Sequence, residues 1–202
     1  MSPSTLFCGK KKSKRFPCSV GAWGTVTGGA FAAKFPKKVL KLVLFAPIFT
    51  GLNSPAKLDS YHVNTPEHAA EDFQKLPDGT LDTSITEPEL VKSFVDQCMT
   101  VDGKGSPNGL RVPLLGTDSL IDLDRIGVPV LIIAGSRDPY LNRSVLDERM
   151  SRSPGKETYA LFEDAGHAIL FEKSHYRKFR NTLAQFSDKK RRLRLGSRRL
   201  RH

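Results

Sequence analysis

The sequence predicts an α/β protein with a mostly parallel sheet flanked by helices, and two apolar segments carry this prediction. Residues 130–134 form a continuous apolar run between Pro129 and Gly135. Such a run is typical of a strand that is buried on both faces, as in a parallel sheet. Residues 39–46 form a second run of this kind, closed by Pro47. Each run has a helix-like neighbour in the sequence, which indicates strands joined by helices.

The other elements are expected in chain order around these two strands. Further strands are predicted at residues 16–21 and 159–162, and further helices at residues 30–34, 65–77, 87–99, 117–123, 142–153 and 173–186. The last of these repeats apolar residues at three- and four-residue steps, which predicts an inner face of Tyr176, Phe179, Leu183 and Phe186. His175 is expected to face solvent.

Length and composition are consistent with one globular domain without a membrane anchor. The chain has 202 residues, and 39% of them are hydrophobic. It contains no run of 18 apolar residues, which argues against a membrane-spanning helix, and no apolar segment near the start that would suit a secretory signal. Three cysteines without metal spacing favour a reducing compartment, so the expected location is the cytoplasm. No metal or cofactor motif is found.

The net charge of +11 is concentrated in two end segments. Residues 10–15 carry five Lys or Arg side chains and residues 189–201 carry eight, which leaves 19 basic residues against 21 acidic ones elsewhere. The predicted organisation is therefore a disordered basic segment at 1–16, one domain at 17–187, and a disordered basic tail at 188–202.

Two polar residues follow predicted strands. Asp138 lies just past the strand at 130–134, and His167 lies just past the strand at 159–162. Because parallel strands bring their carboxyl ends to one edge of a sheet, both side chains are expected at that edge, where α/β proteins bind ligands. Taken singly, each residue could instead be an ordinary surface Asp or a capping His.

Taken together, these segments resemble the α/β-hydrolase fold. Gly135-Ser136-Arg137-Asp138 and Gly166-His167 are similar to the family's acid and histidine segments, in the family's order. Residues 23–47 resemble its elbow helix and following strand. The resemblance implies a hydrolase acting on an ester, amide or similar acyl bond of a small molecule. Asp138 would orient His167, and His167 would act as the base. It also implies a helical lid insertion at about residues 48–118.

The nucleophile elbow departs from the family motif G-x-S-x-G. The chain reads Gly21-Ala22-Trp23-Gly24, so the nucleophile position falls on Ala22 or Trp23, and neither side chain can attack a carbonyl. The segment reads as if one serine were lost between these two residues. Other candidate nucleophiles fit the motif less well: Ser19 would lie inside the strand, Thr25 comes too late, and Cys18 would point into the sheet.

The resemblance covers residues 17–187, the C-terminal part of the family's domain. About 16 residues precede the first predicted strand, too few for the family's earlier strands and its oxyanion loop. We therefore expect impaired activity, an exposed sheet edge that favours self-association, and a truncated or frameshifted gene as the origin of the sequence.

Two other functions remain open at this point. One is a non-catalytic binding or interaction protein, a pseudoenzyme that keeps the fold and pocket. The other is binding of nucleic acid or another polyanion by the tail at 188–202. That tail has no aromatic residues for base stacking, so a simply solvated tail explains it with fewer assumptions.

Overall fold

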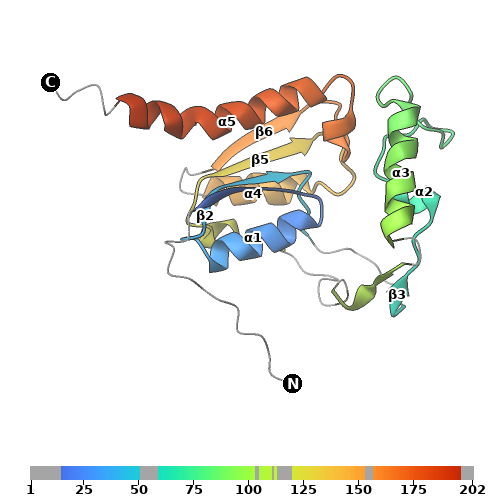
Figure 1. Ribbon diagram of the computed structural model, residues 1–202, viewed down its shortest axis with the longest axis horizontal. Helices are drawn as coiled ribbons and strands as arrows, with labels where there is room; N and C mark the ends of the chain where they lie inside the picture. The colour runs from blue at the N-terminus through green and yellow to red at the C-terminus, as the bar shows by residue number, and fades with distance from the viewer. Residues whose placement is uncertain are drawn as a thin grey trace.

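The computed structural model describes residues 15–50, 59–102, 105–110, 112, 120–152 and 157–196 (Figure 1). Its elements, in chain order, are β1 (Phe16–Gly21), α1 (Gly24–Lys34), β2 (Val39–Phe45), β3 (Tyr61–His62), α2 (Pro66–Ala69), α3 (Pro88–Asp102), β4 (Ser106–Pro107), η1 (Asn108–Leu110), η3 (Leu123–Arg125), β5 (Val130–Gly135), α4 (Arg143–Arg152), β6 (Glu157–Phe162), η4 (Ile169–Phe171) and α5 (Tyr176–Gly196).

The main sheet has four parallel strands in the order β1-β2-β5-β6. In register, Gly21 lies opposite Phe45, Phe45 opposite Ile133, and Ile133 opposite Ala160. All four strands therefore end at the same edge of the sheet. The predicted α/β class with a partial α/β-hydrolase sheet is confirmed, and each of its four predicted strands forms at the expected place.

Both faces of the sheet are covered, which explains why β5 is apolar throughout. Val130 and Ile132 pack on one side with α1 and α4, whereas Leu131 and Ile133 pack on the other side with Phe179 of α5. Figure 1 shows α5 above the sheet and α1 and α4 below it. All six residues of β5 are buried, as expected for a strand between two helical layers.

Residues 59–110 form a separate layer, which we call the lid segment. It contains α2, α3 and the short β3–β4 pair, and it stands at the carboxyl ends of the main strands, on the right of Figure 1. The lid segment thus lies over the edge where Asp138 and His167 are expected.

Of the two helices predicted in the lid segment, the one at residues 65–77 is largely absent, so that prediction is wrong. Residues 65–77 contain only the four-residue α2 and then turn, whereas α3 is even longer than predicted. The Asp78 side chain accepts a hydrogen bond from the backbone N–H of Thr80 at 2.9 Å, and Gly79 has φ +85°. Asp78 and Gly79 thus form a turn that follows the predicted segment, and Gly79 tolerates the left-handed conformation there.

The final helix is also longer than predicted. α5 continues to Gly196, so the basic tail expected to be disordered from residue 188 begins as helix. Lys and Arg are good helix formers, which the interpretation of this stretch as a charge run overlooked. Buried Lys41 of β2 anchors the helix to the sheet: its Nζ donates to the carbonyl oxygens of Phe186 and of Ser187, the latter at 2.8 Å.

Several predictions concern residues that the structure does not describe. The N-terminal segment at 1–14, the end of the tail at 197–202, and residues 117–119 of the helix predicted at 117–123 lie outside the described residues. The described part of that helix is wrong: residues 120–122 are not helical, and Leu123 begins the short η3. Within the described part of the chain, no helix is long and apolar enough to cross a membrane.

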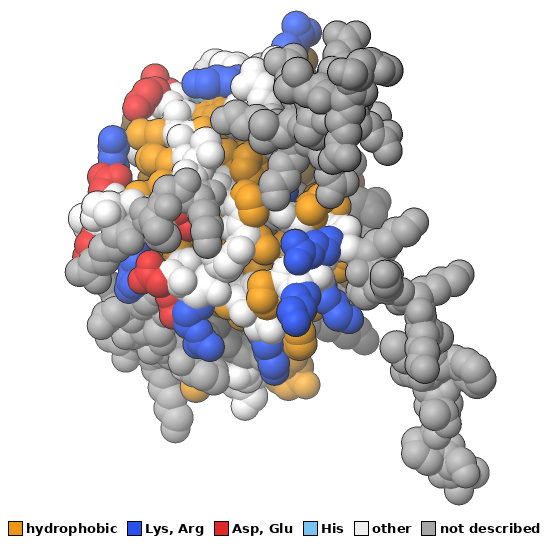
Figure 2. All heavy atoms as spheres, turned by 90° about the vertical axis from the view of Figure 1, so that its left-hand side faces the viewer, with side chains coloured by type: hydrophobic (Ala, Val, Ile, Leu, Met, Phe, Trp, Pro, Cys, Tyr) orange, Lys and Arg blue, Asp and Glu red, His pale blue; other side chains and the backbone are white. Residues whose placement is uncertain are grey.

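The described surface does not carry one sign of charge. On the side shown in Figure 2, Asp and Glu side chains lie toward the left with Lys and Arg side chains beside them, and further Lys and Arg side chains lie at the top and over the lower centre and right. This agrees with the sequence, in which basic residues outside the two end segments are balanced by acidic ones.

Candidate active site

The structure brings Asp138 and His167 together at the carboxyl edge of the sheet. His167 Nδ1 lies 2.9 Å from Asp138 Oδ2, and the exposed fractions of the two side chains are 5% and 0%. The other carboxylate oxygen of Asp138 accepts a hydrogen bond from the backbone N–H of Tyr140 at 2.9 Å. Both oxygens of Asp138 are therefore engaged, which fixes the orientation of the carboxylate toward the imidazole.

The surroundings of His167 favour its charged form. Burial by itself lowers the pKa of His167, but the hydrogen bond to Asp138 and the negative charges of Asp138 and Asp72 outweigh burial and raise this pKa above its ordinary value of 6.5. A histidine held in this way can accept a proton and keep it next to a buried carboxylate.

Tyr140 and Asp72 complete the surroundings of the pair, and sequence reasoning missed both. The Tyr140 ring meets the His167 ring edge to face, with centroids 4.8 Å apart. Burial, together with the charges of Asp72 and Glu71 and a hydrogen bond to Asp72, raises the pKa of the Tyr140 hydroxyl. Tyr140 follows Asp138 in the same loop, which is a local signal, whereas nothing in the sequence connects Asp72 of the lid segment to this loop.

The loop after β5 and the loop after β6 are locked together. A Cβ atom on Gly135 would lie 2.2 Å from the carbonyl oxygen of Ala165, so the position has no room for a side chain. The backbone N–H of Arg137 donates to that same carbonyl at 2.8 Å, and the Arg137 side chain pairs with Asp164 at 2.6 Å. These contacts set the spacing between the Asp138 loop and the His167 loop.

A strained turn joins β1 to α1 at the same edge. Ala22 has φ +48°, a left-handed conformation that non-glycine residues seldom adopt, whereas Trp23 already has helical angles as the residue before α1. Gly21 lies against the Phe45 ring so closely that a Cβ atom there would be 2.1 Å from a ring carbon. The sharp strand–turn–helix shape of an elbow is therefore present, with Ala22 at its apex.

None of the other candidate nucleophiles occupies the apex of this turn. Ser19 sits within β1, opposite Val43. Thr25 is fully buried in α1, and its hydroxyl donates to the carbonyl oxygen of Ala22 at 2.6 Å. Cys18 is also within β1, and burial raises the pKa of its thiol, which disfavours the reactive thiolate.

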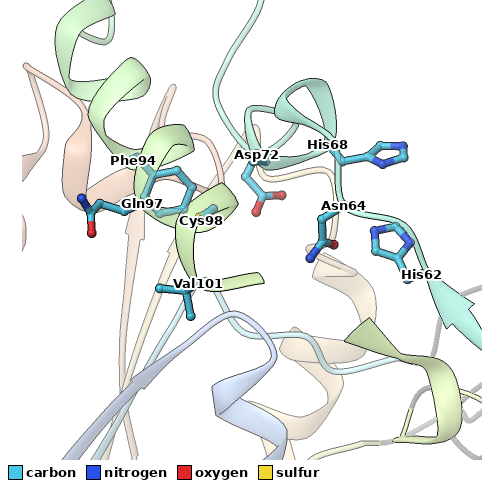
Figure 3. Close-up of a pocket in the computed structure, with 9 residues that line it drawn as sticks. His62, Asn64, His68, Asp72, Phe94, Gln97, Cys98 and Val101 are labelled. Carbon is cyan, nitrogen blue, oxygen red and sulfur yellow. The ribbon is translucent and has the colours of Figure 1, made fainter. Parts of the chain in front are cut away.

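A cavity of about 530 Å³ opens in the lid segment (Figure 3). Its lining residues are His62, Asn64, His68, Ala69, Asp72, Phe94, Gln97, Cys98 and Val101. The part formed by α3 is mainly apolar, and the opposite part is polar. The rings of His62 and His68, for which the sequence indicated no partner, lie 5.2 Å apart. Asp72 connects the cavity with the Asp138–His167 pair, because it lines the cavity and its negative charge helps to raise the pKa of His167.

The prediction that His175 faces solvent is wrong. Only 14% of its side chain is exposed, and Nδ1 lies 2.9 Å from a carboxylate oxygen of Glu172. Its Nε2 lies 3.0 Å from the carbonyl oxygen of Glu163. The helical periodicity of α5 could not reveal this, because His175 precedes the helix and folds back toward the His167 loop.

No group of three or more His, Cys, Asp or Glu side chains in the described part of the chain is arranged to hold a metal ion. The sheet edge itself carries a buried, hydrogen-bonded acid–histidine pair.

Comparison with known proteins identifies relatives of this arrangement. The family described as serine aminopeptidase, S33, has a model that matches residues 10–174. No curated protein matches the chain significantly.

Solved structures share the fold at low identity. The chain is similar to a monoacylglycerol lipase from Paleococcus ferrophilus, with 16% identity, coverage of 85% of this chain and 68% of that one, and a TM-score of 0.50. A meta-cleavage product hydrolase from Pseudomonas fluorescens has 14% identity and a TM-score of 0.58, with coverage of 88% of this chain and 66% of that one. Tomato methylketone synthase I has 12% identity and a TM-score of 0.57, with coverage of 88% of this chain and 71% of that one. The chain thus spans about two thirds of the length of these proteins.

Proposed function

The chain belongs to the serine aminopeptidase (S33) family of α/β-hydrolase fold, and on this premise we propose that it binds an ester, amide or similar acyl compound next to Asp138 and His167 and hydrolyses it slowly. The observation that carries the proposal is the buried 2.9 Å contact between these two side chains, at the sheet edge where the Ala22 turn also lies. Asp138 is the acid and His167 the base.

Ala22 takes the nucleophile position in this proposal, and Trp23 does not. In the family, the nucleophile occupies a strained turn between a strand and a helix. Ala22 has the left-handed φ of such a turn, and Trp23 has helical angles. Because the alanine methyl group cannot form an acyl-enzyme, covalent catalysis is lost.

Slow hydrolysis would then use water as the nucleophile. His167 takes a proton from water as the water oxygen attacks the acyl carbon, and Asp138 stabilises the resulting imidazolium. His167 next gives this proton to the leaving group as the bond to that group breaks. The backbone N–H of Trp23, the residue after the turn, is the proposed donor to the developing oxyanion. These steps need only side chains, backbone and water, so no cofactor is proposed.

The cavity in the lid segment is the proposed site for the rest of the substrate. Phe94 and Val101 offer apolar contacts for an acyl chain, while His62, Asn64 and Asp72 offer polar ones. A cavity of about 530 Å³ is in the range of small-molecule sites.

Restoring a hydroxyl at the turn tests the proposal. We would label the wild-type protein, Ala22→Ser, and the double variant Ala22→Ser/His167→Ala with a fluorophosphonate probe. In Ala22→Ser the new hydroxyl oxygen should bond to phosphorus as fluoride leaves and His167 takes the proton. We expect labelling of Ala22→Ser alone, because the reaction requires both the hydroxyl and the base.

Two outcomes would contradict this assignment. Labelling of the wild-type protein, mapped to Ser19 or Thr25, would place the nucleophile elsewhere. A folded Ala22→Ser protein without labelling would show that Ala22 is not in the nucleophile position. Inserting a serine between Ala22 and Trp23, which restores the full G-x-S-x-G motif, provides the second register to test.

The alternative function is a non-catalytic acyl-binding protein, and the specific observation in its favour is the alanine at the turn. Replacing His167 with Ala distinguishes the two functions. Hydrolysis by the wild-type protein should fall by about 100- to 10,000-fold, the usual contribution of a general base, whereas binding of a fluorescent fatty-acyl ester should change little if the protein only binds.

Two partner proposals follow from other parts of the chain. β1 pairs on one side with β2 and, among the described residues, with no strand on the other, so we propose self-association through its outer edge. A concentration-dependent sedimentation coefficient would support this.

The polyanion contact proposed for the basic tail depends on side chains of residues 189–202, which lie outside those described.

A further inference from the structure

Three consecutive residues of the lid segment reach the loop that carries His167. The charge of Asp72 acts on Tyr140 and on His167, whose rings meet edge to face. Phe73 packs against Phe171, with ring centroids 5.9 Å apart. Gln74 makes the polar contacts described below. We call residues 72–74 the strap.

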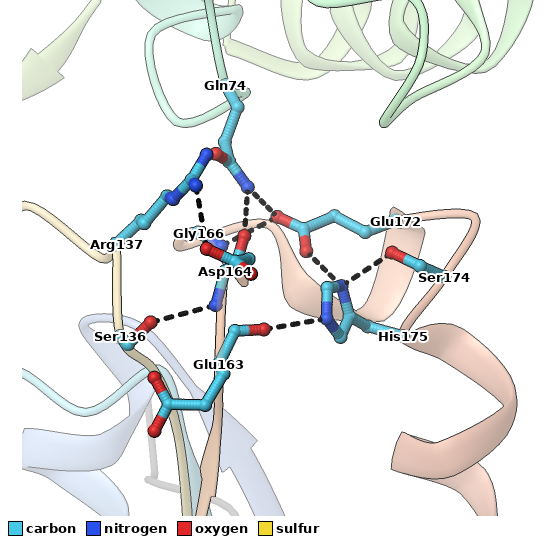
Figure 4. Close-up of polar contacts among 9 residues, drawn as sticks. All are labelled: Gln74, Ser136, Arg137, Glu163, Asp164, Gly166, Glu172, Ser174 and His175. Atoms are coloured by element: carbon cyan, nitrogen blue, oxygen red, sulfur yellow. Dashed lines mark hydrogen bonds and ion pairs between the residues drawn. The ribbon is translucent and has the colours of Figure 1, made fainter.

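Gln74 binds the His167 loop through its side-chain amide (Figure 4). Its Nε2 donates to Glu172 Oε1 at 2.9 Å and to the carbonyl oxygen of Asp164 at 3.1 Å. A Cβ atom on Gly166 would lie 2.7 Å from Gln74 Cγ, so the Gln74 stem rests directly on the backbone next to His167.

Glu172 is the centre of this arrangement, and its side chain is only 1% exposed. Oε1 accepts the backbone N–H of Gly166 at 2.8 Å as well as the Gln74 amide. Oε2 lies 2.9 Å from His175 Nδ1. A buried carboxylate is tolerated only when donors surround it, and losing one donor costs more than the bond itself contributes.

A buried carboxylate at this place has no direct part in the proposed chemistry. Glu172 contacts the backbone of Gly166, the residue before His167, and not the imidazole. Its donors come from the His167 loop and from the strap. The strap in turn lines the cavity through Asp72. One set of contacts thus connects the proposed substrate cavity to the backbone that places the base.

We propose that Gln74 and Glu172 are positioning residues: together they hold the backbone before His167 and couple its placement to the lid segment. The inference rests on the proposed function, because it takes His167 as the base. It adds that the lid segment helps to fix the position of His167. When Gln74 is absent, Gly166 and His167 should fluctuate although Asp138 and the rest of the fold are intact.

Hydrogen exchange of the Gly166 amide, measured by NMR, tests the proposal without any turnover. We would compare Gln74→Leu, Glu172→Ala and Glu172→Gln with Lys75→Leu, the same substitution at the exposed neighbour of Gln74. We expect Gly166 exchange at least about tenfold faster in Gln74→Leu and Glu172→Ala, because a hydrogen bond to a charged group is lost or weakened. The His167 Nδ1–H resonance should broaden in the same variants.

The conservative variant and the control sharpen the expectation. Glu172→Gln keeps an oxygen toward Gly166 and Gln74 and should exchange only slightly faster than the wild type. Lys75→Leu should match the wild type. If Glu172→Ala does not fold, the comparison of Gln74→Leu with Lys75→Leu still tests the proposal.

Two results would overturn the proposal. One is unchanged Gly166 exchange in folded Gln74→Leu. The other is an equal acceleration of exchange across the whole sheet, which would mean that Gln74 serves only general stability. Failure of the labelling experiment with Ala22→Ser would leave this measurement unaffected, so the two proposals fail separately.

Discussion

Ala22, Ala46 and Asp164 share a strained backbone at the same edge of the sheet. Their φ angles are +48°, +45° and +62°, and they follow β1, β2 and β6 respectively. A left-handed conformation costs a non-glycine residue about 1–2 kcal/mol. Such strain persists where the surrounding structure enforces it, and it gathers at functional sites.

Replacing Ala22 with glycine should relieve this strain. We expect Ala22→Gly to raise the free energy of unfolding by about 0.5–1 kcal/mol, the left-handed strain less the added chain entropy. Ala30→Gly, at an exposed position within α1, should lower it by a similar amount. Urea denaturation of both variants measures the difference. Destabilisation by both would contradict the strained turn.

Replacing Asp138 with asparagine should reverse the pKa shift of His167. Burial is then opposed mainly by Asp72, so the pKa should fall below 6.5. In the wild type, the raised pKa contributes stability that is complete below the unfolded pKa and is lost as pH rises through the folded one. The wild type should therefore exceed Asp138→Asn in stability by more at about pH 5.5 than at about pH 8.5. NMR titration of His167 and thermal melts at both pH values check the two statements.

At the scale of elements, the loops after β5 and β6 depend on close backbone contact. Gly135 ends β5 against the carbonyl of Ala165, and the Ser136 hydroxyl accepts the backbone N–H of Asp164 at 2.8 Å. These two loops carry the acid and the histidine. Their mutual fit, more than the regular strands, sets the distance between Asp138 and His167.

A methyl group at Gly135 should disturb this fit. We expect Gly135→Ala to lower the free energy of unfolding by about 1–3 kcal/mol, because the new atom meets backbone that cannot move freely. Gly109→Ala is the matched control, since no atom lies within 4 Å of a Cβ atom there, and it should change stability by less than about 0.5 kcal/mol. Equal effects in chemical denaturation would show that the contact at Gly135 is unimportant.

β2 and β5 could be predicted from the sequence because each is a largely apolar run closed by Pro or Gly, and β1 and β6 because shorter runs end in turns. The structure places β1 at residues 16–21, as predicted. The helices were harder to bound. α2 ends at Ala69, well before the predicted residue 77, and α5 extends through a stretch whose charge suggested a tail. In both cases the apolar periodicity of the sequence did not indicate where the helix ends.

For the whole molecule, the lid segment and the sheet are joined through a shared aromatic cluster. Phe73, Phe94 and Phe171 have ring centroids 5.4–5.9 Å apart, and the backbone N–H of Lys173 donates to Ile85 at 2.8 Å. The lid segment is therefore packed onto the His167 loop as part of the fold.

Deletion of residues 189–202 should weaken binding to polyanions without lowering the thermal stability of the domain. Phe186 is the last core-facing side chain of α5 among the described ones, and Lys41 binds the carbonyl oxygens of Phe186 and Ser187. We expect the thermal midpoint to change little and retention on a heparin column to fall, since eight Lys and Arg residues are removed. A large loss of stability would mean that the end of α5 packs on the domain.

The candidate site could be predicted in part at this scale. Asp138 and His167 follow strands, so their convergence is a consequence of parallel topology. Gln74 and Glu172 lie 98 residues apart in the chain, and no pattern in a single sequence indicates such a pairing. Only the folded lid segment brings them into contact.

The turn at Ala22 has one further consequence, which concerns mutation. The alanine and serine codons of the GCN and TCN sets differ at a single base, and the turn already holds residue 22 in the left-handed conformation. A point mutation could therefore place a hydroxyl at the apex without rebuilding the fold. If this alanine alone prevents covalent catalysis, a single base change in a descendant gene would restore the nucleophile.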